Sequence, residues 1–258
     1  MEKSFQQILT VIITCFHFSL CFNNTKEFRR ITSYSIIMLT LSQAGNIQIL
    51  SNDFNYLPDL VYLNDTEITL SDKSYNFPNC TNLITLYWAQ QLTNLSSIFR
   101  GCSSIATVEF SDFEKVIDIS KMFYQCYSLR EVNFGGLVTT SVKTMESLFY
   151  YCSNLESINL ISFNTKKVQN MKNMFHTCSS LTSLDLSNFD TSSVITMNSM
   201  FYNCIELTTI DVSNFNTSSV TDISKMFRGC LKLLSIDISN FDTSKITDTR
   251  IFLKDVRI

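Results

Sequence analysis

The sequence predicts an α/β solenoid in which each repeat of 24–26 residues contributes one parallel strand and one short helix, with a small β-hairpin cap at the N-terminus. Three observations lead to this prediction: a recurring Phe-x-x-Cys motif, a strand-like leucine pattern after each cysteine, and a helix-like apolar pattern before the next one. An all-β solenoid is the alternative. The motif's cysteines lie 24 and then 26 residues apart, at Phe99/Cys102, Phe123/Cys126, Phe149/Cys152, Phe175/Cys178, Phe201/Cys204 and Phe227/Cys230.

The residues after each cysteine have the pattern of a short, half-buried strand. In the repeat that begins at Cys178, Leu184 and Leu186 share one face of the expected strand and Asp185 points away. Equivalent apolar sets recur at Leu155, Ile158 and Leu160, at Leu207, Ile210 and Val212, and at Leu233, Ile236 and Ile238. A phenylalanine then follows at a fixed offset and is expected to fill the corner, at Phe163, Phe189, Phe215 and Phe241.

The second half of each repeat has the pattern of a short helix. The polar run 190–193 favours a turn or a helix N-cap. The apolar residues that follow are spaced three or four apart, which would gather them on one helical face against the strand: Val194, Met197, Met200, Phe201 and Cys204. A single repeat is expected to stay unfolded, because stability arises only when neighbouring repeats share a core.

The segment before the repeats is expected to form a separate cap. Residues 36–41 and 47–50 flank a turn at 43–46, and residues 60–63 and 68–70 flank Asn64-Asp65, which predicts two β-hairpins. Both prolines of the chain, Pro58 and Pro78, lie in this segment. The predicted organisation is a signal peptide at 1–21, a β-rich cap at 22–79, the repeat solenoid at 80–248, and a C-terminal cap or truncated repeat at 249–258.

The N-terminal residues predict export, so the protein is expected to be secreted or at the cell surface. Apolar residues 8–22 follow Lys3 and are too few to cross a bilayer comfortably, which is typical of a signal peptide; an uncleaved membrane anchor is the alternative. No transmembrane span is expected after signal removal. Because the formal net charge is −3 and no basic run is present, nucleic acid is not an expected partner. Sequons suggest N-glycosylation at Asn64, Asn79, Asn94 and Asn216, with a further one at Asn23.

The repeat resembles that of a known family. Residues 181–192, followed by Met197, Met200-Phe201 and Cys204, resemble the BspA-like leucine-rich-repeat surface proteins of bacteria and single-celled eukaryotes. The resemblance covers about residues 80–248. It implies a solenoid of the leucine-rich-repeat type on an exported surface protein with a role in adhesion or recognition, and it carries over no catalytic residue.

Stacking is expected to align equivalent residues into columns. The cysteine column is interpreted as buried free thiols, with some neighbouring disulfides as the alternative, because strands stack about 4.8 Å apart and a disulfide prefers a shorter Cβ separation. A straight row of thiols does not suit a metal ion. The threonine column is interpreted as turn-stabilising hydroxyls, although a flat threonine array could also bind ice or a polysaccharide: Thr139, Thr165, Thr191, Thr217 and Thr243.

The exposed strand position is the candidate partner-binding face. Successive aspartates in register repel one another, which a cation such as calcium or a basic partner would relieve. The alternative is solvated carboxylates bonded to nearby hydroxyl and backbone groups. The column consists of Glu109, Asn133, Asn159, Asp185, Asp211 and Asp237.

The sequence contains no recognisable catalytic constellation, and no cofactor or metal is expected. Of the two histidines, His17 lies in the signal segment and His176 is interpreted as a structural surface residue. We therefore expect a non-enzymatic adhesion or recognition protein that binds an extracellular protein or glycan through the strand face. The alternative is a coat or matrix component that self-associates end to end.

Overall fold

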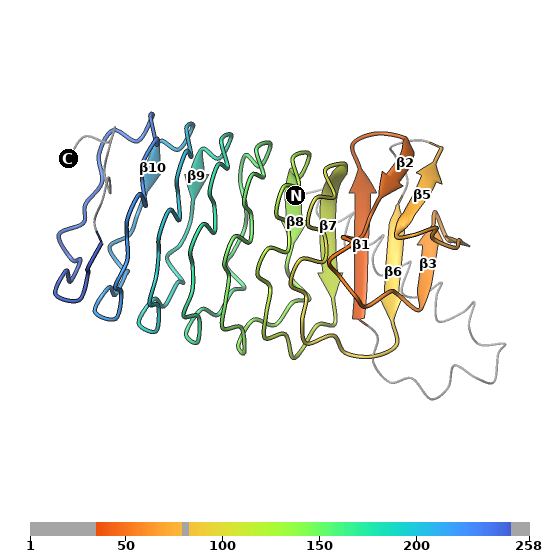
Figure 1. Cartoon of the computed structure of the whole chain (residues 1–258), viewed down its shortest axis with the longest axis horizontal. Helices are drawn as coiled ribbons and strands as arrows, with labels where there is room; N and C mark the ends of the chain where they lie inside the picture. The colour runs from red at the N-terminus through yellow and green to blue at the C-terminus, as the bar shows by residue number, and fades with distance from the viewer. Residues whose placement is uncertain (1–34, 79–82, 249–258) are drawn as a thin grey trace, which may run out of the picture.

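The computed structural model describes residues 35–78 and 83–248. The predicted signal peptide, the C-terminal segment 249–258 and the sequons at Asn23 and Asn79 lie outside these residues. From Ser35 the chain forms a sheet of N-terminal strands and then winds into a row of stacked coils (Figure 1). The described elements are β1 (Ser35–Leu41), β2 (Gly45–Gln48), β3 (Leu60–Leu63), β4 (Thr66–Glu67), β5 (Ser74–Phe77), β6 (Ile84–Trp88), β7 (Ile105–Ser111), β8 (Glu131–Asn133), β9 (Ser183–Leu184) and β10 (Thr209–Ile210).

Four of the N-terminal strands share one sheet with the first two coils, whereas β2 and β5 form a separate two-stranded sheet. The order of the shared sheet is β4-β3-β6-β1-β7-β8, with β1 antiparallel to both β6 and β7, and β7 parallel to β8. The strand β1 alternates buried Ile37, Leu39 and Leu41 with half-buried residues, as expected of a strand with one face on the core. The sheet therefore continues across the predicted boundary between the cap and the repeats.

One of the two predicted hairpins is wrong. The strand β1 does not pair with β2; it lies between β6 and β7, whereas β2 pairs with β5. The central place gives β1 a hydrogen-bonded neighbour on each side, which a two-stranded hairpin could not provide. The turn at Asn64-Asp65 is confirmed: both residues have positive φ (46° and 66°), and β3 pairs with β4, which is nearer to the turn than the predicted 68–70.

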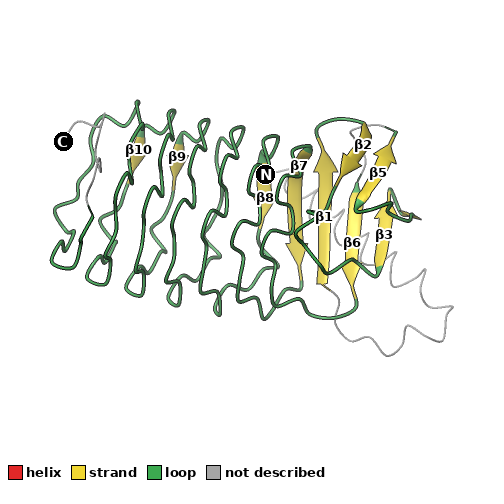
Figure 2. Ribbon diagram, viewed as in Figure 1, coloured by secondary structure: helices red, strands yellow, loops and turns green. Residues whose placement is uncertain are grey.

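The predicted helices are also wrong, because the described residues contain none (Figure 2). In each coil the expected helical segment is a series of turns whose alternate N–H groups donate to carbonyl groups of the next coil. The N–H groups of Ser199 and Phe201 reach the carbonyl oxygens of Ser224 and Met226, each at 2.9 Å. An α-helix would need those N–H groups for bonds four residues back. Two residues per coil also have left-handed backbone, such as Ser199 with φ 55°, which a right-handed helix excludes.

The all-β alternative does not describe the structure either. The strands β9 and β10 form a two-stranded parallel sheet separate from the six-stranded sheet, and residues 155–160 in the coil between β8 and β9 form no strand. Successive coils are instead joined by single parallel bridges, such as those of Thr196 with Asn170 and Asp222. The expectation of a leucine-rich-repeat solenoid is therefore replaced by a stack of turn-rich coils with a sheet at its N-terminal end.

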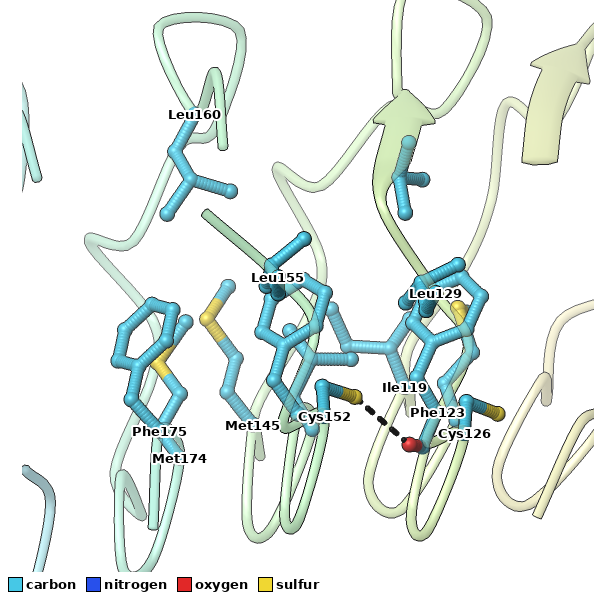
Figure 3. Close-up of a cluster of buried hydrophobic side chains, with 14 of the residues drawn as sticks. Ile119, Phe123, Cys126, Leu129, Met145, Cys152, Leu155, Leu160, Met174 and Phe175 are labelled. Carbon is cyan, nitrogen blue, oxygen red and sulfur yellow. Dashed lines mark hydrogen bonds between the residues drawn. The ribbon is translucent and has the colours of Figure 1, made fainter. Parts of the chain in front are cut away.

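The core of the stack is built from equivalent residues in contact from coil to coil (Figure 3). The motif phenylalanines form a continuous stack, with consecutive ring centroids 5.3–5.6 Å apart, from Phe99 to Phe227. Each such pair contributes about 0.5–1.5 kcal/mol beyond the burial of its area. The predicted inward residues Val194, Met197, Met200 and Cys204 are fully buried.

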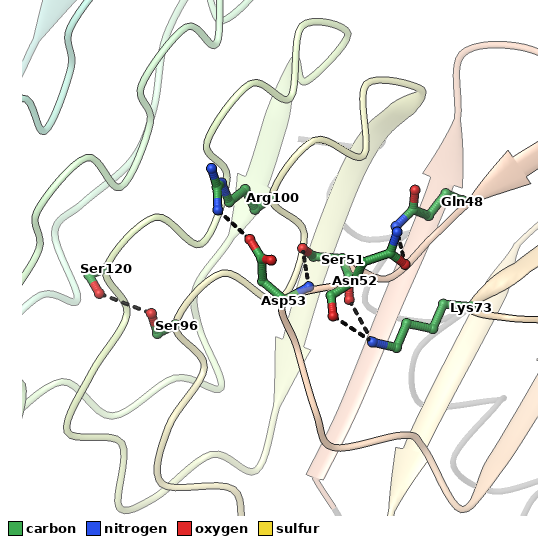
Figure 4. Close-up of polar contacts among 8 residues, drawn as sticks. All are labelled: Gln48, Ser51, Asn52, Asp53, Lys73, Ser96, Arg100 and Ser120. Carbon is green, nitrogen blue, oxygen red and sulfur yellow. Dashed lines mark hydrogen bonds and ion pairs between the residues drawn. The ribbon is translucent and has the colours of Figure 1, made fainter.

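The N-terminal strands are fastened to the first coil by the loop that follows β2 (Figure 4). The N–H of Ser51 donates to the carbonyl oxygen of Ile98 at 2.8 Å, and Asp53 forms an ion pair with Arg100. The ammonium group of Lys73 holds the loop from the other side by donating to the carbonyl oxygens of Ser51 (3.0 Å), Asn52 (3.1 Å) and Phe54 (2.6 Å).

Candidate functional site

The predicted strand-face column lies along one side of the stack. Glu109 is part of β7 and Asn133 part of β8, while Asp185 and Asp211 directly follow β9 and β10. All six members are solvent-exposed except Glu109, which is half-buried. The structure thus places one polar side chain per coil on this face, and only the first two are joined directly, by the Nδ2 of Asn133 donating to Glu109 at 3.2 Å.

Each aspartate of the column is fixed by its own backbone. An Oδ1 atom accepts the N–H two residues on: Asp185 from Ser187 at 2.9 Å, Asp211 from Ser213 at 2.8 Å and Asp237 from Ser239 at 2.9 Å. These bonds lower the pKa of all three carboxyl groups, because an N–H donor stabilises the charged form. The result is a row of oriented, ionised carboxylates, which agrees with the locally bonded alternative.

A shallow depression lies on this face between two neighbouring coils. It is lined by residues 183–185 and 209–211, with Leu184 buried and the two aspartates at its exposed edge. The described residues contain no group of three or more His, Cys, Asp or Glu side chains that could hold a metal ion.

The threonine column is buried in the stack. Thr139, Thr165, Thr191 and Thr217 are 1% exposed, whereas Thr243 in the last described coil is exposed. The Thr191 hydroxyl donates to the carbonyl oxygen of Asn216 at 3.0 Å and accepts that residue's N–H at 2.8 Å. These hydroxyls therefore join adjacent corners and are not available to an external surface such as ice.

A column of asparagines that the sequence reading did not single out performs a similar task. The side-chain Nδ2 of Asn214 donates to the carbonyl oxygens of Leu186 (2.9 Å) and Phe189 (3.0 Å) in the preceding coil. Asn188 and Asn240 make equivalent bonds to the coils before them. The repeated Ser-Asn-Phe tripeptide is the sequence signal for this clamp.

The six described cysteines are free and buried, as predicted. From Cys126 to Cys230, each Sγ–H donates at 3.1 Å to the carbonyl oxygen of the phenylalanine in the preceding coil, as Cys152 does to Phe123 in Figure 3. Burial raises the pKa of Cys102 and of Cys230 to about 12. These thiols are protonated at neutral pH, so they lack the thiolate that nucleophilic or metal-binding cysteines need.

An aromatic column on the surface is the main feature that the sequence reading missed. It is formed by the residue that follows each motif phenylalanine. Tyr124, Tyr150, His176 and Tyr202 stack with ring centroids 4.5 Å apart at each step. Guanidinium groups close both ends, from Arg100 over Tyr124 at 5.1 Å and from Arg228 over Tyr202 at 5.6 Å. Each of the six side chains ends in a planar group, a ring or a guanidinium, and this shared property was the signal that the sequence offered.

His176 occupies the middle of this aromatic column. Its ring lies between Tyr150 and Tyr202, and its Nδ1 is 2.9 Å from the Thr177 hydroxyl. Burial, together with the positive charge of Lys225, lowers the pKa of His176 to about 4. The imidazole is therefore neutral at physiological pH and behaves as one more aromatic member of the column.

Comparison with known proteins adds a family to this geometry. Residues 93–184 and 180–257 each match the family described as "Mycoplasma protein of unknown function, DUF285". The chain belongs to the DUF285 family. Because the two matches follow one another along the coils, the family is one of repeat-containing proteins. No curated protein and no solved structure matches the chain.

The remaining predicted sites of this DUF285 protein are the sequons. Asn64, Asn94 and Asn216 are exposed, and their Oδ1 atoms accept N–H groups from Leu83, Ser96 and Ser218 at 2.8–3.0 Å. A search of residues 35–78 and 83–248 finds no helix with the length and hydrophobicity of a membrane span.

Proposed function

We propose that this DUF285 protein is a non-enzymatic, secreted or surface-exposed protein that recognises an extracellular protein or glycan through its strand face. The observation that carries the proposal is the row of fixed carboxylates at Asp185, Asp211 and Asp237, held one per coil by backbone N–H groups. The resemblance of the repeat to BspA-like surface proteins supports the same role.

Preorganisation is the physical reason to look for a partner on this face. A carboxylate already held in one orientation loses little rotational freedom on binding, so more of each new contact appears as affinity. The depression between residues 183–185 and 209–211 offers a partner an apolar floor beside two of these charges. A partner with cationic or hydrogen-bond-donating groups at regular intervals would complement the row.

The chemistry of the described residues supports binding over catalysis. The thiols are buried with raised pKa values, and the pKa of His176, lowered to about 4, leaves a neutral ring fixed between two tyrosines. A general base needs a pKa nearer to the working pH.

A pair of matched variants tests the strand face. Asp185→Asn with Asp211→Asn removes two charges but keeps the turn, because Asn133 and Asn159 make that turn in earlier coils. The control is Asp190→Asn with Asp242→Asn, which removes two charges from the corner column, where Asn164 and Asn216 make the equivalent turn.

The measurement is binding to immobilised extracellular-matrix proteins and glycans by biolayer interferometry. All proteins are produced without N-glycosylation, because each aspartate-to-asparagine change creates an Asn-x-Ser sequon. We expect the strand-face pair to weaken binding by about three- to tenfold and the corner pair to leave it unchanged. Equal behaviour of the two pairs would remove the strand face as the recognition surface.

A structural role by end-to-end self-association is the second candidate. In the last described coils, Leu231 and Leu234 are 59% and 69% exposed, and Ile205, the equivalent of Leu231 one coil earlier, is 37% exposed. Exposed apolar side chains near one end favour stacking of a second copy there. Sedimentation over a range of concentrations should then show oligomers that Leu231→Ser with Leu234→Thr disperses; a parent protein that stays monomeric excludes the role.

A further inference from the structure

We propose that the aromatic column, from Arg100 through Tyr124, Tyr150, His176 and Tyr202 to Arg228, together with Tyr127 and Tyr151 beside it, is a binding surface for an acidic polysaccharide. This surface is distinct from the strand face and goes beyond the function proposed above. It rests on three features of the described residues: the orientation of the rings, two tyrosines outside the column, and the surrounding charge.

The stacking determines which parts of the rings meet solvent. Tyr124 and Tyr150 are nearly parallel, with an interplanar angle of 6°, and His176 and Tyr202 are inclined by only 14°. Their faces are covered by neighbouring rings, so ring edges and phenol hydroxyls form the outer surface. Rings stacked in this way cannot receive a nucleobase between them, but their hydroxyls can exchange hydrogen bonds with sugar hydroxyls.

Stabilisation of the coils does not account for the whole cluster. Coil-to-coil stacking explains the column itself, but Tyr127 and Tyr151, both close to Tyr150, are 40% and 36% exposed. In the next two coils the position of Tyr127 is Ser153 and then Ser179. A tyrosine supplies a large, rigid contact surface with a polar end, which is why it is favoured in recognition surfaces.

Tyr151 also occupies an unfavourable backbone conformation. Its φ is 60°, in the left-handed region, and Gly101 and Gly229 stand at the equivalent place in other coils. The turn imposes this conformation at the same place in every coil, and a bulky aromatic residue is uncommon in it. Its ring packs against the column, with the ring centroid 4.9 Å from that of Tyr150 and 5.8 Å from that of His176.

The charge around the column selects an anionic ligand. Lys121 and Lys172 lie on the turns of Tyr124 and His176, and Lys225 lies on the turn of Arg228. Within the described part of the chain, neither these three lysines nor Arg228 form an ion pair. Two acidic residues lie at the column: Glu146, which accepts a hydrogen bond from Asn170 at 3.2 Å, and Asp53, which forms an ion pair with Arg100 at one end. A linear acidic polysaccharide can follow a surface that repeats once per coil and meet hydroxyls and cations in alternation.

The test uses hyaluronate and heparin oligosaccharides as acidic probes, neutral dextran as the control and oligothymidylate as the nucleic-acid probe, with titration calorimetry at two salt concentrations. One variant combines Tyr127→Ser with Tyr151→Asn, and a second combines Lys172→Ser with Lys225→Asn. These replacements are found at the equivalent positions, in Ser153, Asn203, Ser224 and Asn173. The control variant is Asp185→Asn with Asp211→Asn on the strand face.

We expect an acidic oligosaccharide to bind the parent protein more weakly at high salt, to bind each column variant about tenfold more weakly, and to bind the strand-face variant at least as well. Failure of both acidic probes to bind, equal binding of dextran, or binding of oligothymidylate alone overturns the proposal. Loss of binding in the strand-face variant would also overturn it, while leaving the strand-face function in place.

Discussion

At the scale of single residues, the cysteine column shows how one side chain serves two coils. The carbonyl oxygen of Phe123 accepts the N–H of Cys126 in its own turn and the Sγ–H of Cys152 from the next coil, both at 3.1 Å. A thiol is small and apolar enough for the core and still offers a weak donor. The protonated thiol is therefore the form that the folded chain requires.

This requirement makes stability depend on pH in the alkaline range. The folded-state pKa of Cys102 and of Cys230 is raised from 9.0 to about 12 by burial. Above about pH 9 the unfolded chain loses these protons while the folded chain keeps them, so the free energy of unfolding falls as pH rises from 9 to 12 and is unaffected by them below pH 9. Urea denaturation at a series of pH values measures the slope. The double variant Cys102→Ala and Cys230→Ala should show a shallower decline; an unchanged slope would contradict the assignment.

Residue burial was more predictable than residue role. Met197, Met200 and Cys204 are spaced three and four residues apart. In the stacked turns, as in a helix, this spacing places the side chains on the same side, so all three are buried as predicted. The role of His176 was missed because its equivalents differ in residue type, although each ends in a planar group. Identity within a column is visible in a sequence; a shared ring geometry becomes visible only when the coils are stacked.

At the scale of elements, helix and stacked turns compete for the same backbone groups. The apolar periodicity of the sequence could not distinguish a helix from stacked turns, because both structures bury the same side chains. Lateral bonds between coils decide the outcome: the N–H of Gln125 donates to the carbonyl oxygen of Tyr150 at 2.7 Å, and such bonds exist only when the next coil is present. The left-handed residues that permit them are mostly not glycine, so the usual sequence signal for that conformation is missing.

The left-handed positions give a direct test of the turn geometry. Gln125 has φ 60°, at the place occupied by Gly101 and Gly229 in other coils. Gln125→Gly should raise the free energy of unfolding by roughly 0.5–1 kcal/mol, because glycine adopts this conformation without steric strain, although its unfolded state is more flexible. Gln125→Val should lower it, since a β-branched residue tolerates positive φ poorly. Urea denaturation measures both; a stabilising valine or a strongly destabilising glycine would contradict the turn geometry.

At the scale of the whole molecule, the N-terminal strands β1, β3, β4 and β6 share one sheet with the first two coils. Local patterns located the strands β1 and β3 well, but the partner of β1 lies far along the chain: Ile37 pairs with both Leu86 and Phe110. No local sequence pattern near residue 37 identifies Leu86 or Phe110 as its partner. The sheet ends in β8, and from there the coils extend by repetition of one set of contacts.

Because each coil makes the same contacts with its neighbours, folding requires that equivalent residues stay aligned from coil to coil and does not require a fixed number of coils. Deleting residues 179–204 joins Cys178 to Ile205, which stands 26 residues after Ser179, so every column stays aligned. This variant should fold, with a urea m-value lower by about a tenth, because the surface exposed on unfolding scales with chain length. Deleting 179–203 instead shifts every later residue by one place and should abolish cooperative unfolding. Trp88 fluorescence follows both transitions, since this single tryptophan is buried in β6. Equal folding of the two deletions would show that the columns do not set the register.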